Sequence, residues 1–344
     1  MVSATGEWKR SLPTWAAQLW MDLQKDTVGT WPSEEPLGPY WQGQVIQHLE
    51  AFIAALEWDD PQAFLGQMVW AAQVARNRGL SESPLLRLLR AMDMGLATHV
   101  PADVMPAARQ LLQRALNALQ VPPEPGRALV STGQRLAPLP QVNDYQWSLV
   151  QGNKGLAQGY VKEAMDGGVS LTEAGVRIIQ PAMYAIGELW ERNRISVAQE
   201  HLASTISQAV LMDAYLQAEF APPNGRKALL ACVQGNHHAL GPRMVSDALE
   251  TAGWDCQYLG ADVPMEDLVR HVGVNRPDML GLSVSMFHHL EAARATIEAL
   301  RAELGNACPQ VWIGGLATVG HDKAWRIARA DGWSSDALDM LERM

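Results

Sequence analysis

Two adjacent histidines follow an apolar segment of the chain, and one of them has the spacing of a metal ligand. Residues 236–241 read NHHALG. A neutral imidazole such as that of His238 ligates transition metals, cobalt among them, while its other ring nitrogen is held by a nearby acceptor. The side-chain carbonyl of Asn236, two positions earlier, can accept that bond. Gly241 has no side chain, so the segment after it can lie close to a bulky ligand.

A second set of residues lies upstream, where Trp190 is followed after nine residues by Glu200 and His201. The indole face can stack on a flat base such as adenine. The carboxylate can accept hydrogen bonds from the hydroxyls of a ribose. The pattern therefore favours contact with a nucleoside; the plain alternative is a helix with a buried tryptophan and a Glu-His pair on its surface.

The residues around His238 must be positioned by the strands and helices that alternate from residue 226 onward. Apolar strands are expected at 227–234, 255–260, 279–285 and 310–315, and helices at 241–252, 265–274, 289–304 and 321–330. This alternation predicts a parallel sheet with Rossmann-like winding over residues 226–335. Ligands bind at the carboxyl ends of such strands. The candidate residues expected at those ends are His238, Gly260, Ser283, Ser285, Gly314 and Gly315.

The segment before the sheet is helical, and residues 142–222 are predicted to form a four-helix bundle. Two glycines, Gly167 and Gly168, interrupt the helical pattern. Either Ser170 or Thr172 can cap the helix that follows, and Pro181 indicates a helix start or a kink. Residues 121–141 are rich in Pro and Gly and are interpreted as a linker.

Residues 1–120 carry helical patterns and no strand signal. Helices are expected at 41–57, at 61–79 and from about residue 83 to His99. Pro101 ends the third of these, and another helix is expected to run to about Leu119. The pattern is similar to that of globin-like helical sensor domains. The sequence thus predicts a multidomain α and α/β protein with a helical sensor region, a bundle and a Rossmann-like domain.

Composition narrows the class of protein. The 344 residues suggest two or three domains, and 48% of them are hydrophobic, which is enough for real cores. A net charge of −10 argues against a general nucleic-acid surface. No apolar run approaches the length of a membrane span. The three cysteines show no CxxC or zinc spacing, so we expect them to be reduced, as in a cytoplasmic protein. From the charge and the apolar runs together, we expect neither a nucleic-acid nor a membrane partner.

Residues 236–241 resemble the cobalt-binding loop of cobalamin-binding domains, which reads acidic-x-His-x-x-Gly. The resemblance makes His238 the lower axial ligand of cobalt, with Asn236 standing where an acidic residue is usual. That family also has a glycine pair after its fourth strand and a serine on its third. Here Gly314-Gly315 and Ser283-Val284-Ser285 match those places, although the usual leucine is missing. The resemblance places them around the nucleotide tail of the cofactor, whereas a lone glycine pair is an ordinary turn.

The run from Trp190 to Glu200-His201 resembles the signature of CarH-type cobalamin-dependent photoreceptors. In that family the helical bundle covers the upper face of the corrin. The resemblance implies that Trp190 packs against the adenosyl group, with Glu200 and His201 nearby. Glu191 stands where CarH-type proteins have a histidine that binds cobalt after illumination. Ligation of cobalt by a residue at this position is therefore not expected here, and His201 is the nearest histidine that could take its place.

These resemblances imply a light sensor that is not an enzyme. It would bind adenosylcobalamin in the base-off, His-on form and signal by Co–C cleavage and rearrangement of domains or of a homo-oligomer, or through a separate output protein. The rival function is a corrinoid methyl carrier of a methyltransferase system. A second rival is a scaffold that has lost its cofactor, for which Asn236 is the hint.

The N-terminal region is rich in tryptophan, with seven of the 13 tryptophans of the chain, including Trp41, Trp58 and Trp70. Core packing explains most of them. A helical sensor region beside a cobalamin module also resembles the photocobilins, which pair cobalamin with a bilin. No cysteine precedes Cys232, so a thioether-linked bilin is excluded. Three alternatives stay open: a non-covalent bilin such as biliverdin, a haem held by His48 or His99, or no ligand.

Overall fold

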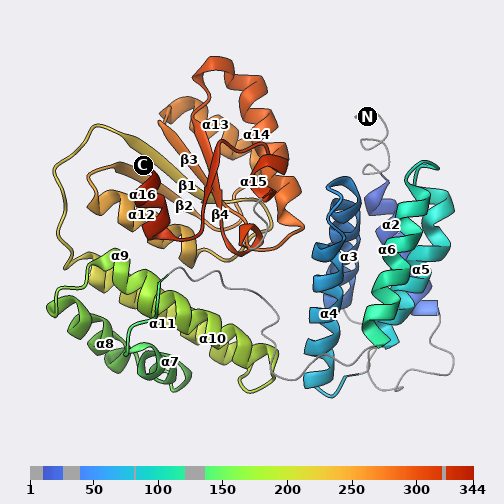
Figure 1. The fold of residues 1–344 in the computed structure, drawn as a ribbon, viewed down its shortest axis with the longest axis horizontal. Coiled ribbons are helices and arrows are strands. Elements are labelled where there is room, and N and C mark those ends of the chain that lie inside the picture. Colours follow the sequence, from blue (N-terminus) through green and yellow to red (C-terminus); the bar gives the residue numbers. More distant parts are fainter. Residues whose placement is uncertain (1–10, 26–38, 81–82, 121–135, 320–322) are drawn as a thin grey trace. The chain divides into compact units, whose positions relative to one another are not determined.

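The computed structural model describes residues 11–25, 39–80, 83–120, 136–319 and 323–344. The chain divides into two compact units, residues 1–129 and residues 130–344 (Figure 1). In the described parts of both units, no helix combines the length and the apolar character needed to cross a membrane.

The N-terminal unit is helical, as predicted. Its described helices are α2 (Leu12–Lys25), α3 (Pro39–Glu57), α4 (Pro61–Asn77), α5 (Ser83–His99) and α6 (Met105–Gln120). Helix α4 begins where predicted because Asp60 caps it, accepting a hydrogen bond from the Gln62 N–H at 3.2 Å, and Pro61 occupies the first turn. Helix α2 packs against α3 and α5, and α4 packs against α3 and α6. Trp15, Phe52 and Phe64 are buried in the core between them.

The bundle opens the second unit. Its helices are α7 (Val142–Val150), α8 (Lys154–Asp166), α9 (Leu171–Ala174), α10 (Gln180–Glu191) and α11 (Val197–Tyr215). A π-helical segment, Gly175–Ile179, joins α9 to α10, so these two form one continuous helix and the bundle has four. Ser170 is the capping residue, paired with Glu173 in a capping box, and Pro181 lies in the first turn of α10.

The sheet is parallel throughout, as predicted. Its strands are β1 (Lys227–Cys232), β2 (Asp255–Gly260), β3 (Met279–Ser283), β4 (Gln310–Gly314) and β5 (Gly332–Ser334), in the spatial order β2-β1-β3-β4-β5. The first and third strands end earlier than predicted, at Cys232 and Ser283. Strand β5 was not predicted. Because the chain winds outward to β2 and then crosses to β3, its direction of winding reverses between β1 and β3, where ligands of such sheets bind.

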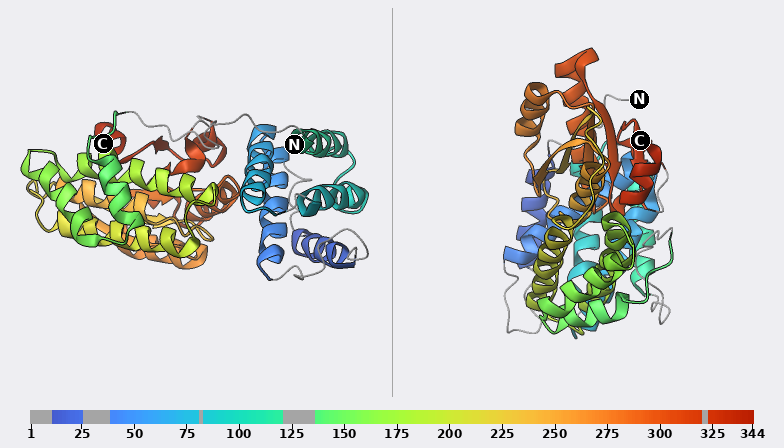
Figure 2. Two further views of the ribbon diagram at one scale, coloured as in Figure 1. Left: turned by 90° about the horizontal axis from the view of Figure 1, so that it is seen from below. Right: turned by 90° about the vertical axis from the view of Figure 1, so that its left-hand side faces the viewer.

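Helices cover both faces of the sheet (Figures 1 and 2). They are α12 (Leu240–Thr251), α13 (Met265–Asn275), α14 (His289–Leu304), α15 (Ala324–Ile327) and α16 (Ala337–Arg343). Helix α12 packs against α16 on one face, and α13 packs against α14 on the other. Helix α15 is shorter than the predicted 321–330, of which residues 321 and 322 lie outside the described part, and α16 was not predicted.

The bundle packs against the α12 side of the sheet domain, through α9 and α11. Gly175 lies at this contact: a Cβ atom there would lie 3.2 Å from the Sδ atom of Met244 on α12, so Met244 would have to shift slightly. The bundle and the sheet domain therefore share one packed boundary within the second unit.

Candidate metal and cofactor centre

His238 lies in the loop after β1, and Asn236 fixes its ring. The Asn236 side chain is fully buried, and its Nδ2 donates a hydrogen bond to the Ser283 carbonyl at 2.9 Å. Its Oδ1 therefore faces His238, accepting from the backbone N–H at 3.1 Å and lying 3.2 Å from Nδ1. Since Oδ1 can only accept, Nδ1 carries the proton and Nε2 keeps its lone pair. The exposed imidazole can thus offer Nε2 to a metal.

The loop before His238 is pinned from the β2 side. Gly235 has a φ of +83°, which favours glycine, and its N–H donates to the Asp262 carboxylate at 2.7 Å. The Asp262 N–H donates back to the Asn236 carbonyl at 2.9 Å, and the Val263 N–H donates to the Cys232 carbonyl at 3.3 Å. These bonds hold His238 on a fixed backbone.

The segment after His238 starts helix α12. The Ala239 carbonyl accepts from the Tyr258 hydroxyl at 2.6 Å and from the Arg243 N–H at 3.3 Å. Gly241 lies in the first turn, and a Cβ atom added there would meet nothing within 4 Å. The same holds for Gly260, at a φ of +85°. Both glycines therefore border open space.

The glycine pair after β4 has a packing role that needs no ligand. Gly315 has a φ of +105°, and a Cβ atom there would lie 2.5 Å from the Val284 carbonyl oxygen. A Cβ atom on Gly314 would lie 3.1 Å from the Ser334 carbonyl oxygen. The pair thus lets the end of β4 lie against the backbone beyond β3 and at β5. Of the predicted serines, Ser283 is buried at the end of β3 and Ser285 is half-buried just beyond it.

Helix α11 brings Glu200 toward the His238 loop. One Glu200 oxygen, Oε2, lies 2.7 Å from His201 Nδ1, and the other accepts from the Ser204 hydroxyl at 2.9 Å. Desolvation by the surrounding protein lowers the pKa of His238, as does His237, while the negative charge of Glu200 acts against them. Residues 38 positions apart in the sequence therefore lie within electrostatic reach of each other.

Trp190 and His201 differ in burial. Trp190 is half-buried near the end of α10 and packs against the bundle core. The His201 side chain is 75% exposed. Glu191, in the place of the histidine of CarH-type proteins, is the last residue of α10.

A second pair of adjacent histidines was not predicted as part of the site. Its signal in the sequence is its place after the third strand, which matches the place of His237 and His238 after the first. His288 and His289 lie at the start of α14, with ring centres 4.2 Å apart. Burial, then the neighbouring histidines, lowers the pKa of His289 to about 3, so this ring is neutral. Among the described residues, no three His, Cys, Asp or Glu side chains gather as a ligand set.

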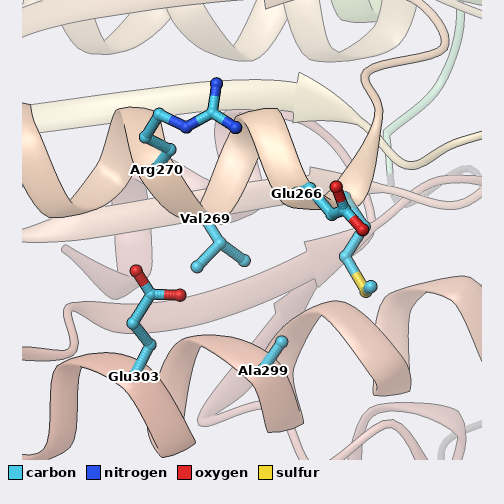
Figure 3. A pocket seen from close by; sticks show the side chains of 6 residues that line it. Glu266, Val269, Arg270, Ala299 and Glu303 are labelled. Atoms are coloured by element: carbon cyan, nitrogen blue, oxygen red, sulfur yellow. The ribbon is translucent and has the colours of Figure 1, made fainter.

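A shallow groove between α13 and α14 is separate from these residues. It has a volume of about 290 Å³, with Met265, Val269 and Ala299 as apolar lining and Glu266, Arg270 and Glu303 as charged lining (Figure 3). None of the candidate residues lines it, so it has no part in the site.

The histidines of the N-terminal unit take part in packing. His48 is buried, and its Nδ1 lies 3.1 Å from Gln67 Nε2. Burial lowers the pKa of His48 to about 4. The His99 ring stacks on Trp15, with centres 5.1 Å apart. His48 is thus a core histidine, and the half-buried His99 packs on a tryptophan, which weakens the case for haem. Trp58 and Trp70 are half-buried, and the Trp41 side chain lies outside the described residues.

Comparison with known proteins finds two families that bind cobalamin. Residues 226–342 match a family described as B12 binding domain, and residues 141–212 match a second family of the same description. The HTH-type transcriptional repressor CarH of Myxococcus xanthus is 28% identical over 242 residues, covering 69% of this chain and 75% of the repressor. The HTH-type transcriptional repressor CarA of that organism is 38% identical over 133 residues, covering 38% of this chain and 44% of CarA.

Corrinoid proteins are similar as well. Dimethylamine corrinoid protein 3 of Methanosarcina acetivorans is 28% identical over 151 residues, covering 43% of this chain and 68% of that protein. The solved structure of the Methanosarcina barkeri monomethylamine corrinoid protein matches with a TM-score of 0.51 at 21% identity, covering 58% of this chain and 97% of that one. At this identity the structural likeness concerns the fold. Residues 141–212 and 226–342 of the second unit thus match B12-binding families, and the chain is similar both to the CarH and CarA repressors and to corrinoid proteins.

Proposed function

We propose that this chain is a light sensor that binds adenosylcobalamin base-off, with His238 as the lower axial ligand. The observation that carries the proposal is the bond between Asn236 Oδ1 and His238 Nδ1, which leaves Nε2 as the ligating nitrogen in a B12-binding domain. A single protein ligand suits cobalamin, because the corrin supplies four nitrogens of its own.

The residues around His238 fit such a cofactor. Gly241 and Gly260 border open space, so a flat macrocycle can approach the backbone there. We assign Ser283, Ser285, Gly314 and Gly315 to the surroundings of the nucleotide tail. Asn236 is uncharged and therefore raises the basicity of the imidazole less than an aspartate would, so the bond from His238 to cobalt should be weaker than in relatives with an acidic residue.

The bundle would cover the opposite face of the corrin. Adenosylcobalamin supplies a Co–C bond that light can break. In this proposal Trp190 covers the adenosyl group, and Glu200, already held by Ser204, accepts hydrogen bonds from the ribose. His201 lies beside Glu200 and is exposed, so it is the histidine available on that side once the upper group has left.

Signalling would follow from the shared boundary between the bundle and the sheet domain. Loss of a buried group leaves a void, and packed boundaries respond to voids by discrete shifts. We propose output through oligomer contacts or a separate partner, without enzymatic turnover and without direct nucleic-acid contact. Scattering profiles of the full chain in darkness and after illumination test this step: identical profiles across a range of concentrations would contradict it.

The globin-like identity of the N-terminal unit and a non-covalent biliverdin in it belong to the same proposal. Their support is the all-helical fold and the many tryptophans of this unit. A biliverdin titration tests the pigment. A saturable, red-shifted band at stoichiometric pigment is expected, and its absence would end the idea.

A corrinoid methyl carrier is the second candidate, favoured by the similarity to dimethylamine corrinoid protein 3. A carrier must move its cap away to expose cobalt, which a tryptophan over the upper ligand would hinder. Absorption spectra of the reconstituted chain separate the two. A sensor shows rapid, wavelength-dependent loss of the adenosyl spectrum with a shift in assembly, whereas a carrier shows light-independent methyl transfer from methylcobalamin to a thiol or a partner enzyme.

A further inference from the structure

A series of contacts leads from the carbonyl next to His238 to the last residue of bundle helix α11. The Tyr258 hydroxyl, on β2, donates to the Ala239 carbonyl at 2.6 Å. The Arg243 guanidinium carbon, on α12, lies 5.8 Å from the centre of the Tyr258 ring and 5.6 Å from that of Tyr215. Tyr215 is the last residue of α11. One cation thus contacts an aromatic ring from the sheet and another from the bundle.

Arg243 is held in this place by Asp247, one turn later on α12. The Arg243 Nε donates to Asp247 Oδ1 at 2.7 Å, and the Asp247 side chain is buried. Breaking such a pair would leave a buried charge uncompensated. The planar guanidinium therefore has a fixed position between the two rings, which a flexible lysine could not reproduce.

We propose that Tyr258 and Arg243 are positioning residues for the lower cobalt ligand, and that Arg243 couples this ligand to the position of α11. Tyr258 fixes the carbonyl next to His238, and Arg243 joins the Tyr258 ring to Tyr215. The proposal rests on the proposed role of His238. Movement of the bundle would thereby change the geometry of the histidine on the opposite face of the corrin.

The test of Tyr258 uses the full chain loaded with cob(II)alamin under anaerobic conditions. Electron paramagnetic resonance then reports an axial nitrogen by its hyperfine splitting. Tyr258→Phe keeps the ring and removes the hydroxyl, and we expect partial loss of the splitting with about fivefold weaker binding, the scale of one hydrogen bond. Tyr184→Phe is the control, because the Tyr184 hydroxyl accepts from Gln180 Nε2 at 3.1 Å within the bundle, and it should match wild type.

The test of the coupling uses Tyr215. Tyr215→Phe keeps the aromatic face toward Arg243 and should match wild type, whereas Tyr215→Leu should reduce the axial nitrogen signal. The double variant Tyr258→Phe/Tyr215→Leu should weaken binding by less than the product of the single effects. The effect of Tyr215→Leu reaches His238 through Arg243 and the Tyr258 hydroxyl, and Tyr258→Phe already lacks that hydroxyl. Arg243→Lys, which keeps a cation beside Asp247, gives a second measure if Tyr258→Phe does not fold, and it should show the same loss.

Three results would overturn the proposal, and they are distinguishable. An unchanged splitting in Tyr258→Phe, with wild-type affinity, contradicts the positioning role. Fully multiplicative effects in the double variant contradict the coupling through Arg243. A wild-type spectrum without axial nitrogen contradicts His238 as the ligand, and the inference fails together with the proposed function.

Discussion

The Nδ1 atom of His238 lies 3.2 Å from the Oδ1 atom of Asn236, while the Asn236 amide nitrogen binds the carbonyl of Ser283 at the end of β3. One buried side chain therefore joins the loop after β1 to the neighbouring strand and selects the tautomer of an exposed histidine. This arrangement needs no charge, because a neutral amide carbonyl accepts a hydrogen bond from the imidazole N–H, as a carboxylate would.

Replacing His238 by Ala should abolish the axial nitrogen signal of bound cobalamin and leave the spectrum base-off. The side chain is exposed, so the free energy of unfolding of the apoprotein should change by less than about 0.5 kcal/mol. His237→Ala is the matched control, one residue away and also exposed. Spectra with the effects of the two variants exchanged would show that the neighbouring histidine is the ligand.

Replacing Asn236 by Ala removes the acceptor that orients His238. It also removes one of the two hydrogen bonds of the Ser283 carbonyl, which keeps the bond from the Val233 N–H at 3.3 Å. We expect cobalamin affinity to fall about 10- to 100-fold, the usual effect of losing such a partner. The apoprotein should lose about 1–3 kcal/mol, since Asn236 is fully buried. Cobalamin titration and chemical denaturation measure the two effects, and unchanged affinity would refute the orienting role.

Two glycine variants should separate packing from ligand approach. Gly315→Ala places a Cβ atom against the Val284 carbonyl at a positive φ and should cost the apoprotein at least about 2 kcal/mol. Gly241→Ala meets open space within a helix, so it should leave the apoprotein as stable or stabilise it by about 0.5 kcal/mol. Cobalamin binding by Gly241→Ala should nevertheless weaken. Equal binding in wild type and Gly241→Ala would remove this glycine from the site.

Much of this arrangement could be predicted from the sequence, and the exceptions have physical reasons. The four longer strands are short apolar runs between helices, and Asn236 acts within two residues of His238, so local pattern was sufficient. Strand β5 has three residues and α16 has seven, too few for a periodic signal. The nearness of Glu200 to His238 depends on how the bundle packs on α12, which spacing along the chain does not encode. Gly315 was predicted for ligand approach, and the structure adds a backbone contact with Val284 that the sequence pattern does not reveal.

The stability of the apoprotein should depend on pH through Asp247. Burial raises the pKa of Asp247 to about 6, although Arg243 acts against this. An acid whose pKa is raised by folding favours the folded state when protonated. That contribution is complete below the ordinary Asp value of about 4 and is lost as the pH rises through about 6.

Asp247→Asn is neutral at every pH, so the difference in stability between this variant and wild type should move in favour of the variant as the pH rises from 4 to 7, by up to about 2–3 kcal/mol. The loss of the charged bond to Arg243 sets where that difference starts. Denaturation of both proteins across this range measures the difference. A stability difference that stays constant with pH would show that Asp247 does not titrate in this window.

The role of Trp190 can be separated from its contribution to packing. Trp190→Ala should speed the light-driven loss of the adenosyl group and weaken dark binding, because the group would no longer be enclosed from the bundle side. The half-buried ring also packs against the bundle core, so Trp190→Ala should lose some stability. Trp190→Phe should keep most of the wild-type stability, because a phenyl ring preserves most of this packing. Trp147→Ala is the control: this side chain lies on α7 of the same bundle and is 57% exposed. Photolysis is followed by absorption under fixed illumination. If Trp190→Ala and Trp147→Ala both photolyse at the wild-type rate, Trp190 does not cover the upper ligand, and the bundle must approach the corrin through another surface.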